Sequence, residues 1–185
     1  MKTIAILASG SGTNAEEIMK YFQTSSKGKV VLVASNKKEA FVLERAKKFQ
    51  VPTHTFNKAS LESGELVQKL KDYQVDFVVL AGFLLKIPTN LIQAFPDKII
   101  NIHPALLPKY GGKGMYGAKV HEAVKDTGDR ESGITIHLVN ENYDEGKIIF
   151  QAAVPILPED SAETIAKKVH QLEYKYFPNV IESLL

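Results

Sequence analysis

Short, continuously apolar runs alternate with amphipathic stretches along the first hundred residues of this chain. Such runs are typical of strands that are buried on both faces of a parallel sheet. We predict strands over 3–7, 30–34, 53–56, 77–81 and 98–103. The stretches between them have helical periodicity, which predicts helices over 15–21, 41–49, 64–73 and 89–95. This order of elements predicts a parallel sheet with crossover helices.

The second half of the chain departs from this alternation. Ser132 to Val139 alternates apolar and polar side chains, which predicts a half-exposed strand with an antiparallel neighbour over 148–156. Helices are predicted over 118–125 and 161–184, and Pro178 is expected to kink or break the second of them. We therefore predict one doubly wound, Rossmann-like α/β domain over residues 1–185, with a mostly parallel seven-stranded sheet and helices on both faces.

Composition narrows the classes of partner. The chain has no cysteine, which excludes disulfides and thiolate zinc sites and is compatible with the cytoplasm. A net charge of +2 is too small to indicate binding to nucleic acid or to an anionic membrane surface. No apolar run is long enough to span a bilayer. These properties predict a soluble, cytoplasmic, single-domain protein.

A glycine loop joins the first predicted strand to the first helix. Residues 10–15 fit the loose pattern G-x-G-x-x-A, in which backbone N–H groups at a helix N-terminus bind phosphate. The second strand ends over 35–38 in Ser-Asn-Lys-Lys, without the acidic residue that would hold the ribose of NAD. We favour a single phosphate held by the glycine loop, with Thr13 and Asn14 as extra donors. An NADP-dependent oxidoreductase remains an alternative, because the lysines tolerate a 2′-phosphate.

The predicted strand over 98–103 carries two polar side chains at its end. Asn101 and His103 are two positions apart, so their side chains point to the same face of the strand. Pro104 cannot donate to a strand ladder and therefore ends the strand. Ligands of open α/β sheets bind just beyond the carboxyl ends of strands. An amide donor and a titratable base at this edge indicate a site for acyl chemistry.

Three further loops connect the predicted elements. Two of them allow either a structural or a functional interpretation, and the third is typical of a hairpin turn. Phe83 to Pro88 follows a buried strand and either covers the core or forms the wall of a pocket for a flat apolar ligand. Gly111 to Gly117 contains four glycines and is either a flap or a plain surface loop. Asn140 to Gly146 has the chemistry of a hairpin turn.

The remaining histidines are given structural roles. His54 and His137 are predicted to be ordinary strand residues, and His121 is predicted to lie on the surface of a helix. None of them has a second candidate ligand at a spacing typical of metal sites, so no metal is predicted.

With these motifs in order, the chain resembles the glycinamide ribonucleotide formyltransferase family from end to end. That family transfers a formyl group from 10-formyltetrahydrofolate to the amine of glycinamide ribonucleotide, the third step of purine synthesis. The strongest elements of the resemblance are the segments Ser9–Asn14, Leu80–Phe83, Asn101–Pro108, Ser132–Thr135 and Tyr143–Gly146. Independent motifs that agree in order and context make the match specific.

The resemblance implies roles for the residues at matching positions. The catalytic trio would be Asn101, His103 and Asp144. The ribonucleotide would be bound by Gly12, Thr13, Asn14, Pro104, His170 and Glu173. Its phosphate would lie on the glycine loop, and its ribose hydroxyls would contact the glutamate. Folate binding, with the pterin ring read by loop backbone, is implied for Leu84, Leu85, Lys86, Ile87, Asn101, Asn140 and Tyr143.

The chemistry of formyl transfer suits the implied trio. Attack by the amine places negative charge on the formyl oxygen, to which Asn101 can donate a hydrogen bond. We expect Asp144 to raise the pKa of His103, so that a charged imidazole stabilises this oxygen and helps a proton reach the departing N10 nitrogen. Neither a metal nor a covalent intermediate is needed.

The chain departs from the family pattern at several positions. Leu84 and Leu85 stand where Met and a basic residue are more usual, and Ala105 stands where Ser is more usual. Gly64 stands where some members have an arginine that contacts folate, which puts the anchoring of the glutamate tail in doubt. The loop over 111–117 is also unlike that of many members.

Rival readings share parts of the pattern. Formyltetrahydrofolate hydrolase and methionyl-tRNA formyltransferase use the same trio, but the first normally carries a domain before this one and the second a domain after it. The small net charge also fits tRNA poorly. A catalytically silent nucleotide-binding module and the NADP-dependent oxidoreductase are alternatives from other classes. Monomer and homodimer are both compatible with the sequence.

Overall fold

The computed structural model describes residues 1–185 and contains one seven-stranded sheet. Its strands are β1 (Lys2–Leu7), β2 (Gly28–Ser35), β3 (Thr53–Thr55), β4 (Phe77–Leu80), β5 (Ile99–His103), β6 (Glu131–Leu138) and β7 (Ile148–Pro155). The order across the sheet is β3-β2-β1-β4-β5-β6-β7. Strands β1 to β5 pair in parallel, whereas β6 pairs antiparallel with both β5 and β7. The predicted mostly parallel α/β sheet is confirmed.

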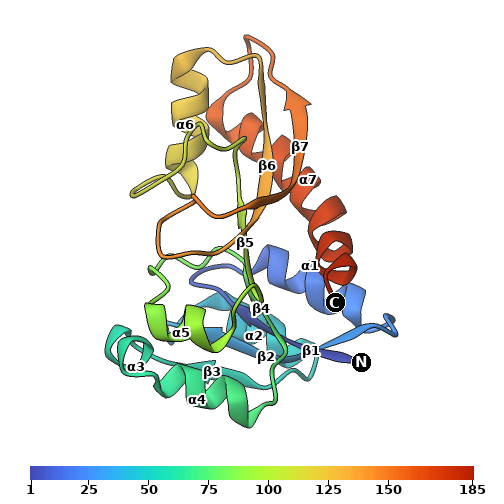
Figure 1. Cartoon of the computed structure of the whole chain (residues 1–185). Helices are drawn as coiled ribbons and strands as arrows, with labels where there is room; N and C mark the ends of the chain where they lie inside the picture. Colours follow the sequence, from blue (N-terminus) through green and yellow to red (C-terminus); the bar gives the residue numbers. More distant parts are fainter.

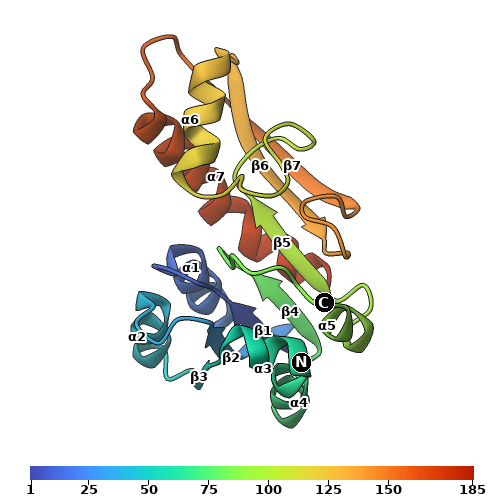
Figure 2. The same cartoon turned by 90° about the vertical axis from the view of Figure 1, so that its left-hand side faces the viewer.

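Helices cover both faces of the sheet, as Figures 1 and 2 show. The helices are α1 (Thr13–Phe22), α2 (Phe41–Lys48), α3 (Lys58–Ser63), α4 (Glu65–Asp72), α5 (Thr89–Ala94), α6 (Ala118–Thr127) and α7 (Ala162–Ser183). Ile4 of β1 belongs to a core that packs under α1, α2, α6 and α7. Its neighbour Ala5 belongs to a second core under α3, α4 and α5. This alternation is the period of two that strand geometry imposes.

The strand predicted over 132–139 and its antiparallel neighbour are confirmed, but the prediction that this strand is half-exposed is wrong. In β6 the residues from Ser132 to His137 are all buried. Helix α7 packs on one face of β6, and the segment after β5 covers the other. The hydroxyl of Thr135 accepts a hydrogen bond from the Leu107 N–H at 3.0 Å and donates one to the Ala105 carbonyl at 2.7 Å. The buried hydroxyl of Thr135 therefore bonds to a neighbouring loop and does not face solvent.

Some helix boundaries also differ from the predictions. The first helix begins at Thr13 because Gly12 adopts a left-handed conformation, with φ of 75°, at its N-terminus. Helix α3 was not predicted, although Asn57 caps it by accepting the N–H of Ser60 at 2.8 Å. Pro178 neither breaks nor ends α7, which continues to Ser183 with the proline ring buried.

The strand order places a topological switch point between β1 and β4. From β1 the chain proceeds outward through β2 and β3 on one side, then returns to β4 and proceeds through β5 on the other side. The loops that leave the carboxyl ends of β1 and β4 therefore diverge, one toward each face. Such a point is where open α/β sheets bind ligands.

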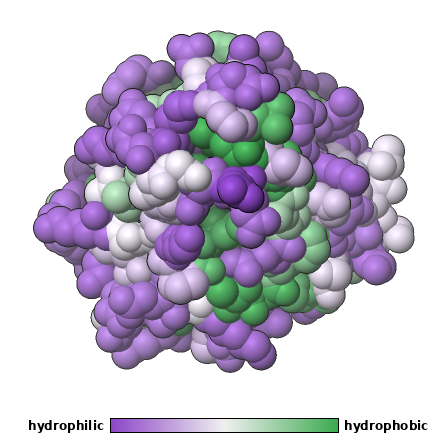
Figure 3. All heavy atoms as spheres, turned by 90° about the horizontal axis from the view of Figure 1, so that it is seen from above, coloured by the Kyte–Doolittle hydropathy of each residue, from purple (hydrophilic) through white to green (hydrophobic).

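The surface is mixed in character. Figure 3, a view from above, shows a band of hydrophobic residues bordered by hydrophilic ones. The large hydrophobic side chains that are exposed include Leu84, Tyr116, Tyr143, Ile148 and Leu157. None of the helices, not even the 22-residue α7, combines the length and apolar character required to traverse a bilayer.

Replacement of Gly133 by alanine tests the packing of β6 on β7. A Cβ atom at this position would overlap the carbonyl oxygen of Ala152, and strand backbone cannot move aside without breaking the ladder. We expect Gly133→Ala to lower the free energy of unfolding by about 3 kcal/mol, measured by urea denaturation. Ser132→Ala is the control, because it removes a buried hydroxyl that has no hydrogen-bond partner. Equal stability of the two variants would contradict this account.

Candidate active site

A cavity of about 810 Å³ opens at the switch point. It lies between the N-terminus of α1, the loop that follows β4, the end of β5, the glycine-rich segment before α6 and the loop between β6 and β7. Every residue for which the resemblance implied a role lines this cavity, from Gly12 on one side to Tyr143 on the other. The sheet thus brings together segments that are far apart in sequence.

Strand β5 positions the first two polar side chains. Asn101 is partly buried and His103 is 3% exposed, and both lie on the side of β5 that faces the cavity. In the antiparallel pairing with β6, Asn101 lies opposite His137 and His103 lies opposite Thr135. Residues directly opposite each other project to the same face. The pairing therefore adds His137 to the site, where the prediction had given it only a strand role.

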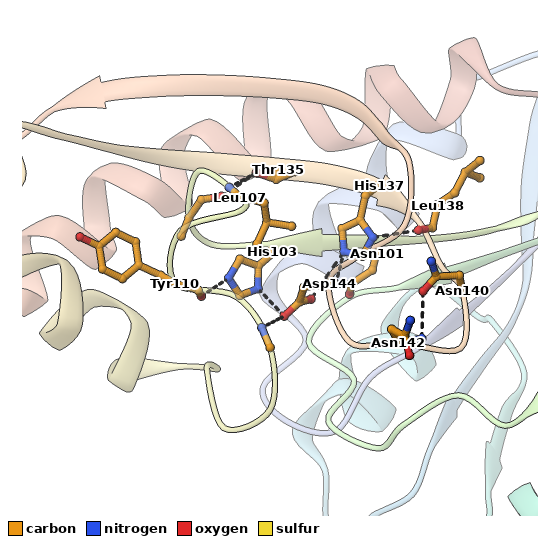
Figure 4. Close-up of polar contacts among 12 residues, drawn as sticks. Asn101, His103, Leu107, Tyr110, Thr135, His137, Leu138, Asn140, Asn142 and Asp144 are labelled. Atoms are coloured by element: carbon orange, nitrogen blue, oxygen red, sulfur yellow. Dashed lines mark hydrogen bonds and ion pairs between the residues drawn. The ribbon is translucent and has the colours of Figure 1, made fainter.

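His137 orients the amide of Asn101, as Figure 4 shows. The Nδ1 atom of His137 lies 2.9 Å from the Leu138 carbonyl oxygen, which can only accept, so Nδ1 carries the proton. The Nε2 atom is then an acceptor and takes a hydrogen bond from Asn101 Nδ2 at 3.1 Å. Because an amide nitrogen has two hydrogens, a second donor of Asn101 is left for a ligand.

Asp144 lies between the two histidines in the loop that joins β6 to β7. Its Oδ2 atom is 3.6 Å from His103 Nδ1, and its Oδ1 atom is 3.6 Å from His137 Nε2. The Gly112 N–H donates to Oδ2 at 3.0 Å, which ties the glycine-rich segment to the site. Burial alone would raise the pKa of Asp144, but this N–H, together with the attraction of either histidine when it is protonated, holds it below the ordinary value. The carboxylate is therefore ionised.

The protonation of His103 follows from its surroundings. Its Nε2 atom lies 2.7 Å from the Tyr110 carbonyl oxygen, so Nε2 carries the proton and Nδ1 faces Asp144. Burial lowers the pKa of His103, and this effect outweighs the opposite influences of Asp144 and the carbonyl. Asp144 acts in the expected direction, but the expectation of a raised pKa is wrong. Desolvation of the imidazolium is the larger effect.

The N-terminus of α1 forms one end of the cavity. The helix has no side-chain cap, so the N–H groups of its first turn remain without partners in the helix. A Cβ atom at Gly12 would overlap Val42 of α2, and only glycine combines this close approach with the left-handed backbone. Unpaired N–H groups at a positive helix end are suited to bind a phosphate.

Helix α7 contributes the side chains next to this helix end. Asn14 donates to Glu173 Oε2 at 2.8 Å, which joins α1 to α7. Glu173 is 5% exposed, and burial raises its pKa to about 7 in spite of the hydrogen bond from Asn14. His170 is half-buried beside His121. The prediction that His121 lies on a surface is wrong, because α6 packs against α7 and leaves His121 only 3% exposed.

The loop after β4 forms another part of the cavity wall. The backbone groups of Leu85, Lys86 and Ile87 make no hydrogen bond within the protein. Leu84 is 41% exposed, whereas Phe83 and Ile87 pack into the core under α3 to α5. The loop therefore has both predicted roles, because its apolar side chains cover the core and its backbone lines the cavity. Asn140 and Tyr143 line the facing wall.

No group of three or more histidine, cysteine, aspartate or glutamate side chains is arranged to hold a metal ion. His103 and His137 each have a ring nitrogen 3.6 Å from a carboxylate oxygen of Asp144, so these side chains face one another.

Thermal unfolding of Glu173→Gln tests the burial of this carboxyl group. A pKa raised from 4.5 to about 7 means that the stability present below pH 4.5 is lost as the pH rises through 7. Glutamine keeps an oxygen for Asn14 but never ionises. We expect the variant to become more stable than the original chain as the pH is raised from about 5 to 8.5, by on the order of 3 kcal/mol at the upper end. Glu122→Gln, at an exposed position on α6, is the control. A stability difference between Glu173→Gln and the original chain that does not change with pH would contradict the raised pKa of Glu173.

Comparisons with known proteins indicate one family. The family model described as formyl transferase matches residues 2–181. The chain is 46% identical to the chloroplastic phosphoribosylglycinamide formyltransferase of Arabidopsis thaliana, over 99% of this chain and 65% of that protein. It is 38% identical to the phosphoribosylglycinamide formyltransferase of Bacillus subtilis, over 100% of this chain and 95% of the other.

Solved structures show the same likeness. Glycinamide ribonucleotide transformylase 1 from Geobacillus kaustophilus superposes with a TM-score of 0.91 at 36% identity, over 100% of this chain and 99% of that one. The chain spans about two thirds of the length of the plant relatives and nearly all of this bacterial structure. The fold, the cavity and these similarities together show that the chain belongs to the formyl transferase family.

Proposed function

We propose that this chain is a glycinamide ribonucleotide formyltransferase of purine synthesis, with 10-formyltetrahydrofolate as formyl donor. The observation that carries the proposal is that Asn101, His103 and Asp144 line one cavity together, with His103 and Asp144 3.6 Å apart. That cavity has a phosphate-binding helix end on one side and a loop with free backbone groups on the other. Two substrates held at these ends would meet at the three side chains.

The ribonucleotide would lie at the α1 end. Its phosphate would accept hydrogen bonds from the N–H groups of Gly12, Thr13 and Asn14. Glu173 would accept the ribose hydroxyls, with His170 beside it. The glycinamide amine would then extend past Pro104 toward His103, its neighbour at the end of β5, since both residues line the cavity.

The folate would lie at the β4 end. The backbone N–H and C=O groups of Leu85, Lys86 and Ile87 provide an edge of donors and acceptors for the pterin ring. Leu84 and Tyr143, both exposed and apolar in large part, provide contact area on the two sides of the opening. Asn140 lies on the same wall as Tyr143. Recognition through backbone tolerates the unusual side chains at 84 and 85.

The formyl group would be placed at Asn101. As the amine nitrogen bonds to the formyl carbon, the carbonyl π electrons move to oxygen, and the free N–H of Asn101 stabilises that charge. Collapse of the adduct breaks the bond from carbon to N10 and leaves the formyl group on the amine. Holding both substrates in one cavity makes this step effectively unimolecular.

His103 would move the proton that the amine loses. With Nε2 committed to the Tyr110 carbonyl, Nδ1 is the atom that takes up the proton. The imidazolium so formed faces the ionised Asp144, which stabilises it while the reaction proceeds. The lowered pKa of His103 favours return of the proton, and N10 of the departing folate accepts it.

Formyltetrahydrofolate hydrolase is the alternative that shares this chemistry, since water could replace the amine. The phosphate-binding end of the cavity favours the ribonucleotide. The family assignment likewise favours formyl transfer over the NADP-dependent alternative. The decisive assay follows folate absorbance with the purified chain and 10-formyltetrahydrofolate, with and without glycinamide ribonucleotide. Folate release that requires the ribonucleotide is expected, whereas release without it would indicate the hydrolase.

Substitution of Asn101 tests the role given to its amide. Asn101→Ala removes the donor to the developing oxyanion, so we expect kcat to fall by about 10² to 10³, with smaller changes in either KM. Asn179→Ala is the matched control, because Asn179 bonds only to the Lys175 carbonyl on an exposed part of α7. A kcat for Asn101→Ala within a few-fold of the control would refute the assignment.

A further inference from the structure

Ser9 connects the two substrate loops of the cavity. It lies between the end of β1 and the glycine loop and is 2% exposed. Its hydroxyl accepts a hydrogen bond from the Leu84 N–H at 3.0 Å and donates one to Asn36 Oδ1 at 2.6 Å. Its own N–H donates to the Gly82 carbonyl at 3.0 Å. One residue therefore holds the turn from Gly82 to Leu84 at both ends.

This turn has little other support near the cavity. Gly82 has a positive φ of 73°, and beyond Leu84 the backbone of residues 85–87 makes no hydrogen bond within the protein. The orientation of the backbone of residues 85–87 is consequently set by the peptide group that precedes it. That peptide carries the Leu84 N–H bonded to Ser9. The same bond withdraws the Leu84 N–H from ligand binding and leaves the next three residues to provide donors.

Asn36 completes the arrangement. A serine hydroxyl has one hydrogen, and here the carbonyl oxygen of Asn36 accepts it. The lone pairs of the hydroxyl are thereby directed to the Leu84 N–H. Asn36 follows β2, at the place where dinucleotide enzymes have the acidic residue that binds ribose. Its bond to Ser9 gives it a different role in this chain.

We propose that Ser9 is a positioning residue for the folate, through which the loop that binds the ribonucleotide phosphate sets the backbone of residues 85–87. The proposal rests on the proposed function and deepens it. Without the hydroxyl, the Leu84 peptide has to turn to find another acceptor, because an unpaired N–H in a partly buried place is costly. The donors and acceptors of the following residues then no longer match the folate.

Steady-state kinetics of Ser9→Ala test the proposal, with each substrate varied in turn. We expect KM for the formyl folate to rise about tenfold, while KM for the ribonucleotide stays within about twofold, since the backbone of Ser9 and Gly10 is unchanged. A residue with only a general structural role would affect both substrates alike. Ser132→Ala is the control, being an equally buried serine whose hydroxyl bonds to nothing.

A second pair of variants keeps the test decisive if Ser9→Ala does not fold. Asn36→Ala removes the acceptor that orients the hydroxyl but leaves Ser9 in place, so KM for folate should rise about threefold. Asn36→Asp retains an acceptor oxygen and should restore KM for folate close to that of the original chain. Equal effects of the two substitutions on KM for folate would overturn the role of the Asn36–Ser9 bond.

The outcomes separate the two proposals. Absence of ribonucleotide-dependent transfer in the original chain would refute the proposed function. Transfer in the original chain, with the two KM values changed equally or not at all in Ser9→Ala, would overturn only the inference about Ser9. A selective rise of KM for folate, reproduced by Asn36→Ala and reversed by Asn36→Asp, would support it.

Discussion

Hydrogen bonding of β5 on both of its edges is the constraint on which the site depends. Strand β4 pairs with it in parallel and β6 antiparallel, so its backbone is fixed along its whole length. Asn101 and His103 are therefore held on a rigid strand, and Pro104 ends the strand at the cavity. The antiparallel partner adds His137 by register, and the loop after that partner adds Asp144. A site on strands is more precise than one built on loops alone.

Burial determines the electrostatic character of this site. His103 and Glu173 are both almost fully enclosed, and in each the neutral form is favoured: the pKa of the histidine is lowered and that of the glutamate is raised to about 7. Asp144 escapes this effect because the Gly112 N–H donates to it and because either neighbouring histidine attracts it when protonated. The cavity therefore contains one lasting negative charge beside a neutral imidazole that can accept a proton, which is an arrangement suited to acyl transfer.

The divergence of loops at the switch point creates a second requirement. The loop after β1 and the loop after β4 leave for opposite faces of the sheet, yet the substrates they would hold must react with each other. The Ser9 hydroxyl bridges these loops, and Asn14 similarly bridges α1 to α7. Hydrogen bonds between segments distant in sequence thus join loops and helices that line the cavity.

The sequence by itself determined the strands, most helices, the glycine loop and the placement of Asn101 and His103 on one face of a strand, because periodicity and turn residues act locally. It did not reveal His137 as a neighbour of Asn101, the burial of His121 or the lowered pKa of His103. Those features depend on which strand lies beside β5 and which helix covers α6. Only the tertiary structure decided them, because register and desolvation arise from contacts between segments that local sequence patterns do not specify.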